Sequence, residues 1–167
     1  KRGFTNNFLI TLKVICFVLL GIDSCSGLWW RFGAPESWDR YPNEFGVLKQ
    51  SSGLSCSPTA AAMLLFQYGI LASEGEMAYL GGTTLFGSDG PAMARALQAK
   101  VRDKGWVTHT GKTNLEEVLQ RKVPFLAHIR GSSYGHAITV VFITVVFISK
   151  DTVFYLDPAL GEPRMLP

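Results

Sequence analysis

The fold of this chain is decided by one stretch, Gln50-Ser51-Ser52-Gly53-Leu54-Ser55-Cys56-Ser57-Pro58-Thr59-Ala60-Ala61-Ala62-Met63-Leu64-Leu65-Phe66-Gln67-Tyr68-Gly69. Pro58 favours the first turn of a helix, the residues after it are mostly strong helix formers, and Gly69 stands where helices commonly end. The pattern predicts a helix over residues 57–68. Cys56 then stands at its N-terminus.

The position of Cys56 indicates a nucleophile. Unpaired backbone N–H groups and the helix dipole stabilise negative charge at a helix N-terminus, which raises the thiolate fraction of a cysteine there. Gln50, six residues upstream, carries a side-chain amide that donates hydrogen bonds. Together with the backbone N–H of Cys56, this amide is expected to stabilise the oxyanion of a tetrahedral intermediate.

Such a nucleophile needs a general base and a group that orients the base. His136 begins one strongly apolar run, and Asp157 ends the next, residues 153–156. If the runs are antiparallel strands joined by a polar turn at residues 149–152, His136 and Asp157 meet at one end of a sheet. His128 is the rival base, but it lies in mid-strand and lacks the Gly-rich approach that precedes His136.

These features resemble the papain-like cysteine peptidases that process bacteriocins and remove double-glycine leader peptides. The likeness covers about residues 46–167 and rests on the following residues: Gln50, Cys56, Pro58-Thr59-Ala60, Gly135-His136, Asp157-Pro158 and Gly161. It implies an α+β papain-like fold, with helices first and an antiparallel sheet afterwards. It also implies Cys56 as nucleophile, His136 as base, Asp157 as orienting group and Gln50 as oxyanion donor.

The resemblance further implies a peptide substrate cleaved after a Gly-Gly leader, with no metal or cofactor. Small residues before the cleaved bond imply a narrow cleft, for which Trp106 and Tyr134 are candidate walls. The family usually has Gly after the nucleophile, whereas this chain has Ser57, whose Cβ is expected to crowd the substrate backbone. Two alternatives stay open: a transglutaminase-like acyl transferase with the same order of Cys, His and Asp, and a catalytically impaired module that holds a leader peptide for a neighbouring transporter.

A tandem repeat lies between the two residues of the expected pair. Residues 138–142 and 143–147 both read Ile-Thr-Val-Val-Phe, so the copy adds five residues between His136 and Asp157. An odd insertion in a strand turns every later side chain to the other face unless a bulge absorbs it. We expect a bulge or enlarged loop within residues 142–150 to take up the copy and to leave Asp157 opposite His136.

The remaining elements follow from capping and periodicity. Ser73 and Glu76 form a capping-box pattern before a short helix. Asp89 is expected to cap a third helix over residues 91–104 rather than to act as a catalytic acid. The other expected elements are a strand at residues 106–108, a helix at 113–121 and a strand at 123–129.

Composition excludes several classes of protein. The net charge of +3 with scattered basic residues argues against a nucleic-acid partner. Three cysteines without C-x-x-C spacing argue against a zinc site and a disulfide framework. His109 lies in a polar loop and is expected to be solvated. With 17% charged residues, the chain is expected to form one core plus an appendage.

The appendage is the N-terminal segment, in which residues 8–22 are nearly all apolar. A signal peptide, a membrane anchor and a buried helix all fit such a run. The first two are favoured, because Lys13 can reach towards the side of Lys1 and Arg2. We therefore expect residues 1–30 to be a signal or membrane-anchor segment, with membrane association through residues 8–30. Residues 31–45 are then a linker, and residues 46–167 a peptidase domain outside the cytoplasm.

Overall fold

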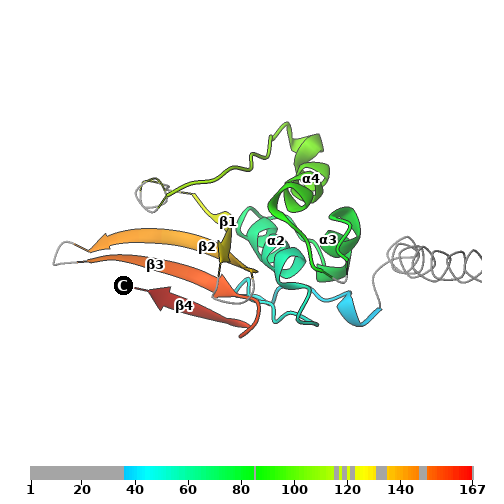
Figure 1. Ribbon diagram of the computed structural model, residues 1–167, viewed down its shortest axis with the longest axis horizontal. Coiled ribbons are helices and arrows are strands. Elements are labelled where there is room, and N and C mark those ends of the chain that lie inside the picture. The colour runs from blue at the N-terminus through cyan, green and yellow to red at the C-terminus, as the bar shows by residue number, and fades with distance from the viewer. Residues whose placement is uncertain are drawn as a thin grey trace, which may run out of the picture.

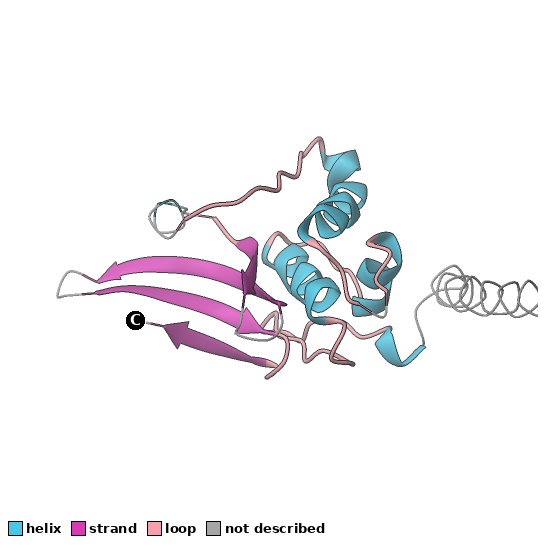
Figure 2. Cartoon of the chain, in the orientation of Figure 1, coloured by secondary structure: helices cyan, strands magenta, loops and turns pink. Residues whose placement is uncertain are grey.

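The structure, a computed structural model, describes residues 36–84, 86–114, 117, 120, 123–130, 135–146 and 150–166. Within these ranges three α-helices come first and a four-stranded antiparallel sheet follows (Figures 1 and 2). The chain therefore has the α+β architecture that the sequence predicts. The expected signal or anchor segment, residues 1–30, lies outside the described residues, and so does Tyr134.

The described helices are α2 (Cys56–Gln67), α3 (Glu74–Leu80) and α4 (Gly90–Val101), with short 3-10 helices η1 (Glu36–Trp38) and η2 (Arg102–Lys104). Two of them, α3 and α4, begin where their capping residues predict. Ser73 Oγ accepts the N–H of Glu76 at 3.0 Å, and Asp89 Oδ1 accepts the N–H of Ala92 at 2.8 Å. Both predicted N-caps are confirmed, and each satisfies a backbone donor that a helix start leaves unpaired.

Helix α2 is the centre of the fold. Its residues 57–65 are all buried, as is typical of a helix that is apolar on every side. It packs against β2 on one side and against α3 and α4 on the other (Figure 1). The alanines at residues 60–62 leave room for the sheet to approach the helix backbone closely. The start of α2 is thereby fixed between a helical layer and the sheet.

The sheet has the order β1-β2-β3-β4, and all neighbouring strands are antiparallel. Its strands are β1 (Phe125–Arg130), β2 (Gly135–Val146), β3 (Lys150–Asp157) and β4 (Glu162–Leu166). Strand β4 was not predicted. It follows a turn at Gly161, whose φ is +69°, and it contains Pro163, which an edge strand tolerates.

The prediction of a strand at residues 106–108 is wrong. Among the described residues this segment has no strand partner, and its backbone instead binds one side chain of α4. Gln98 donates to the carbonyl of Trp106 at 2.9 Å and accepts the N–H of Thr108 at 2.8 Å. The side chain satisfies the groups that a neighbouring strand would have satisfied. The expected helix at 113–121 lies largely outside the described residues, although Asn114 Oδ1 accepts the N–H of Glu117 at 2.9 Å.

The repeat between His136 and Asp157 lengthens the β2–β3 hairpin, so the expectation that a bulge or loop takes it up is largely wrong. The copy pairs along β3, from Ile143 opposite Val153 to Val146 opposite Lys150. One register shift, between Val140 and Phe142, absorbs a single residue. The expected turn at 149–152 is also wrong, because β3 already begins at Lys150. Both strands gain length together and extend beyond the helices (Figure 1). The end of the hairpin that carries His136 and Asp157 therefore stays in place.

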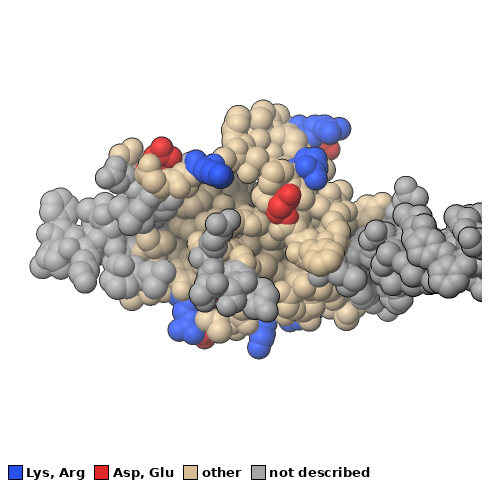
Figure 3. Space-filling view, in the orientation of Figure 1, with Lys and Arg blue, Asp and Glu red and all other residues tan. Residues whose placement is uncertain are grey.

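The face drawn in Figure 3 carries few charged side chains, and its Lys and Arg residues stand apart from one another. One ion pair, between Lys100 and Glu76 at 2.7 Å, joins α4 to α3. Across the described ranges no helix has both the length and the apolar character needed to cross a membrane.

Candidate active site

Cys56 is the first residue of α2 and is partly buried. The preceding residue, Ser55, does not cap the helix with its side chain. Its hydroxyl instead accepts the N–H of Ser52 at 3.0 Å and donates to the carbonyl of Ser52 at 2.9 Å. The Ser55 side chain therefore leaves the N–H groups of the first turn of α2 without a side-chain cap.

Ser57, whose Cβ the sequence predicts to crowd the substrate backbone, is buried against another part of the chain. Its side chain is only 3% exposed, and its hydroxyl donates to the carbonyl of Ser88 at 3.0 Å. The Cβ therefore belongs to the contact between α2 and the segment that leads into α4. This residue tethers the start of the helix to that segment.

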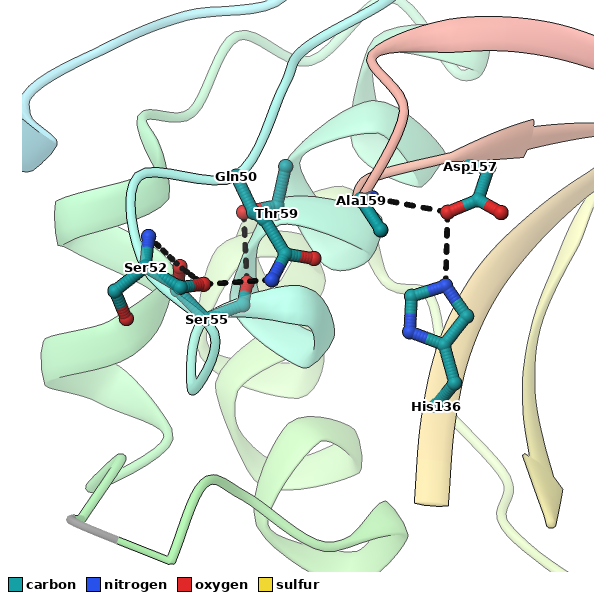
Figure 4. Close-up of polar contacts among 7 residues, drawn as sticks. All are labelled: Gln50, Ser52, Ser55, Thr59, His136, Asp157 and Ala159. Atoms are coloured by element: carbon teal, nitrogen blue, oxygen red, sulfur yellow. Dashed lines mark hydrogen bonds and ion pairs between the residues drawn. The ribbon is translucent and has the colours of Figure 1, made fainter. Parts of the chain in front are cut away.

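His136 and Asp157 meet at the end of the sheet, as their positions in the sequence predict. His136 Nε2 lies 2.8 Å from Asp157 Oδ1, and the same oxygen accepts the N–H of Ala159 at 2.9 Å (Figure 4). An ionised carboxylate can only accept, so Nε2 carries the hydrogen and Nδ1 keeps a lone pair. Figure 4 shows Nδ1 on the side of the ring turned away from Asp157, towards Gln50. The carboxylate thus fixes the orientation of the ring and favours one tautomer of the neutral imidazole.

A chain of backbone contacts connects this pair to the start of α2. The N–H of Gln50 donates to the carbonyl of Pro158, the residue after Asp157, at 2.8 Å. Gly161 closes the same turn against Lys49, and a Cβ built on Gly161 would lie 2.5 Å from the Cβ of Lys49. Only glycine fits this approach. The strand that ends at Asp157 and the loop that begins at Gln50 are consequently fixed side by side.

The Gln50 amide lies between Ser55 and Ala159 in Figure 4. Its Nε2 donates one hydrogen to the carbonyl of Ser52 at 2.6 Å. Its Oε1 is buried, and none of the described residues donates a hydrogen bond to it. Turning the amide over would bring two carbonyl oxygens together, so the bond to Ser52 fixes the orientation. The second hydrogen on Nε2 is left for another acceptor.

The sequence did not reveal the role of Glu74, which supports this loop from below. Its Oε1 accepts the N–H of Ser51 at 2.9 Å, and its Oε2 accepts the hydroxyl of Ser51 at 2.7 Å. The capping-box pattern explains why α3 starts at Glu74. The capping-box pattern does not predict that Glu74 binds Ser51, because this contact depends on how the helices pack.

The other candidates take no part in the contact between His136 and Asp157, although His128 lies opposite Ala137, the next residue after His136. His128 has no hydrogen-bonded carboxylate among the described residues, and burial lowers its pKa while Asp89 opposes that shift. His109 is exposed in the loop after α4, as expected. Trp106 packs edge-on against Tyr68, with ring centroids 5.7 Å apart, at the C-terminal end of α2. The interpretation of Trp106 as a cleft wall is therefore wrong, since a helix of 12 residues separates it from Cys56 by about 18 Å.

Two comparisons with known proteins show what the chain is similar to. The model of the Peptidase_C39 like family matches residues 42–164, a stretch that contains Gln50, Cys56, His136 and Asp157. The chain is also similar to an uncharacterized protein of Methanothermobacter marburgensis. The two are 28% identical over 119 residues, which cover 71% of this chain and 75% of that protein.

Proposed function

This chain belongs to the Peptidase_C39 like family, and we propose that it is a cysteine peptidase that uses Cys56, His136 and Asp157. The observation that carries the proposal is the contact between His136 and Asp157. Asp157 Oδ1 accepts hydrogen bonds from the His136 ring and from the N–H of Ala159. The second bond holds the carboxylate in place beside the ring. A fixed base is what a cysteine nucleophile needs and what a purely structural histidine does not require.

We propose the following reaction for these groups. His136 Nδ1 accepts the proton of the Cys56 thiol, and the thiolate attacks the carbonyl carbon of the scissile peptide bond. The carbonyl oxygen becomes an oxyanion, which accepts the second amide hydrogen of Gln50 and the N–H of Cys56. The imidazolium then gives its proton to the leaving amine as the C–N bond breaks. A thioester between Cys56 and the acyl part of the substrate remains.

Water completes the cycle. His136 accepts a proton from a water molecule, whose oxygen attacks the thioester carbonyl. The second tetrahedral intermediate expels the Cys56 thiolate and releases a carboxylic acid. Asp157 keeps its charge throughout and stabilises the imidazolium in both halves of the reaction.

For the substrate we propose a peptide that is cleaved after two glycines. The support is the resemblance to the peptidases that remove double-glycine leaders, carried by the residues around Cys56, His136 and Asp157. Glycines before the scissile bond leave no side chains to be accommodated next to the nucleophile. The acyl-transfer alternative differs only in the group that attacks the thioester, which is an amine in place of water.

The test is hydrolysis of a fluorogenic peptide that ends in Gly-Gly, with the full chain as enzyme. We expect turnover by the wild type and a loss of about 10⁴-fold or more in Cys56→Ala. A matched peptide with two valines in place of the glycines should be cleaved more slowly. Added amines with mass spectrometry of the products separate hydrolysis from acyl transfer. A Cys56→Ala variant that retains activity contradicts the proposal.

A further inference from the structure

Glu74 is a fully buried carboxylate for which the reaction as described has no role. Charged side chains are rarely buried unless they are bonded, because burial removes their hydration. Both oxygens of Glu74 bind one residue, Ser51, through its N–H at 2.9 Å and its hydroxyl at 2.7 Å. Hydrogen bonds to an ionised acceptor are about twice as strong as neutral ones. Glu74 therefore holds Ser51 more firmly than an ordinary loop contact would.

Ser51 lies between the two groups that orient the Gln50 side chain. On one side is the backbone of Gln50, whose N–H binds Pro158 at 2.8 Å. On the other is Ser52, whose carbonyl accepts the Gln50 amide at 2.6 Å. A rotation of the peptide at Ser51 would move that carbonyl and the amide with it. Both ends of this three-residue segment are anchored independently, and Glu74 is the anchor of its middle.

We propose that Glu74 is a positioning residue of the active site, which fixes Ser51 and through it holds the Gln50 amide where the oxyanion develops beside Cys56. This inference rests on the proposed peptidase function. Glu74 touches neither the substrate nor the reacting atoms, so its effect passes through Gln50. An oxyanion donor acts on the transition state more than on the bound substrate. Loss of Glu74 should accordingly lower kcat and leave KM nearly unchanged.

The experiment compares Glu74→Ala and Glu74→Gln in the full chain. Glu74→Ala should reduce kcat by about ten-fold or more, because a misplacement of roughly 1 Å can cost about 100-fold. Glu74→Gln keeps an acceptor for the N–H of Ser51 and should recover part of the loss. Glu76→Gln is the matched control on the same helix. Glu76 pairs with Lys100 at 2.7 Å and does not contact Ser51. The kcat of the Glu76→Gln variant should therefore stay at the wild-type value.

A double-mutant cycle with Gln50→Ala identifies the route of the effect. If Glu74 acts through Gln50, adding Glu74→Ala to Gln50→Ala should change kcat by less than about two-fold. The rate of alkylation of Cys56 by iodoacetamide should be equal in the wild type and in Glu74→Ala, since alkylation forms no oxyanion. Additive effects in the cycle, or an equal fall in alkylation, would overturn the proposal and show a general structural role.

Two measurements without a substrate separate this inference from the peptidase proposal. Hydrogen exchange of the Ser51 amide should be slow in the wild type and fast in Glu74→Ala. The side-chain amide signals of Gln50 in NMR spectra should shift in the same variant and stay in place in Glu76→Gln. If the wild type cleaves no peptide, the peptidase proposal fails, and these signals still decide whether Glu74 positions Gln50. Unchanged exchange and unchanged signals overturn the inference. Should Glu74→Ala fail to fold, Glu74→Gln and Ser51→Ala give the same readouts at smaller amplitude.

Discussion

Thr139 on β2 donates its hydroxyl to the carbonyl of Ala60 in α2 at 2.6 Å, and both residues are completely buried. Thr139 lies three residues after His136, and Ala60 lies four residues after Cys56. The bond therefore aligns the strand that carries the proposed base with the helix that begins at the proposed nucleophile. A side chain that binds a helix carbonyl requires close contact, which the neighbouring alanines of α2 permit.

Replacing Thr139 by valine tests this alignment. Thr139→Val keeps the shape but loses the hydroxyl, so the free energy of unfolding should fall by about 1 kcal/mol. The Ala60 carbonyl remains an acceptor within the helix, which limits the loss. Alkylation of Cys56 should also slow, because strand and helix lose their alignment. Thr108→Val is the matched control, since Thr108 donates to the carbonyl of Ala94 at 2.9 Å away from the site. The control should lose similar stability in chemical denaturation, and an equal slowing of alkylation in it would contradict the assignment.

The reactivity of Cys56 provides a second prediction. At about pH 6 a free thiol is less than about 1% thiolate. With His136 as its proposed base, Cys56 should react with iodoacetamide much faster than free cysteine at that pH. His136→Ala should remove most of this advantage. Label on the other cysteines is subtracted by repeating the measurement in Cys56→Ala. A rate that is indifferent to His136→Ala would show that the pair does not act on the thiol.

The Asp157 variants refine this prediction. Asp157 Oδ1 alone receives both the His136 ring and the N–H of Ala159. Asp157→Asn retains a carbonyl oxygen that can accept both bonds, so it should keep more of the reactivity than Asp157→Ala. In Asp157→Ala the ring is free to rotate and to change tautomer. Equal rates in the two variants would mean that orientation by this oxygen is unimportant.

A third prediction concerns stability and pH. Burial lowers the pKa of His128 below its ordinary value of 6.5 in the folded protein, and the charge of Asp89 only partly opposes this. The unfolded chain therefore binds a proton more readily than the folded protein. The stability that neutral His128 contributes is complete above about pH 6.5 and is lost as the pH falls through and below that value. His128→Gln should flatten the fall in unfolding free energy between about pH 7 and pH 5. His109→Gln, at an exposed position, is the control that should leave the slope as it is.

The sequence was a good guide where structure depends on neighbouring residues. Ser73 and Asp89 cap their helices as predicted, since an N-cap needs only the next three residues. The pairing of His136 with Asp157 also followed, because an antiparallel hairpin brings the start of one strand to the end of the next. The sequence was a poor guide where packing between distant segments decides the structure. The segment around Trp106 is held by hydrogen bonds to Gln98 of α4. No pattern in the neighbouring sequence predicts this partner.

Glu74 shows the same limit within the candidate site. Its place in a capping box explains the start of α3, but its contact with Ser51 depends on the packing of α3 beneath the loop before α2. The repeat illustrates a different difficulty. The sequence showed that five residues had been added, yet it did not show that β3 begins at Lys150 and can pair with them. Lys150 and Asp151 are polar, as residues in a turn usually are, so the sequence predicts a turn where β3 begins.

Deleting residues 143–147 provides the last prediction and tests the role of the repeat. In the shortened chain Ile148 follows Phe142 and takes the position opposite Val153 that Ile143 holds in the structure. Residues 149–152 are then free to form a four-residue hairpin loop, a common length for such connections. The register shift after Val140 is untouched, and so is everything between it and His136.

The deleted pairs lie where the hairpin extends beyond the helices, while the proposed site lies at the opposite end of the same strands (Figure 1). Thr139 stays opposite Leu156 in the shortened protein, because this pair lies between the deleted residues and the end of the hairpin that carries His136 and Asp157. The His136 ring should therefore keep its bond to Asp157, and activity should stay within about two-fold of the wild type. Alkylation of Cys56 and thermal unfolding measure this directly. Thr139→Val, in the same strand but against α2, is the contrasting variant and should be the more damaging of the two. A deletion that unfolds the protein or abolishes alkylation would show instead that the repeated arm supports the site from a distance.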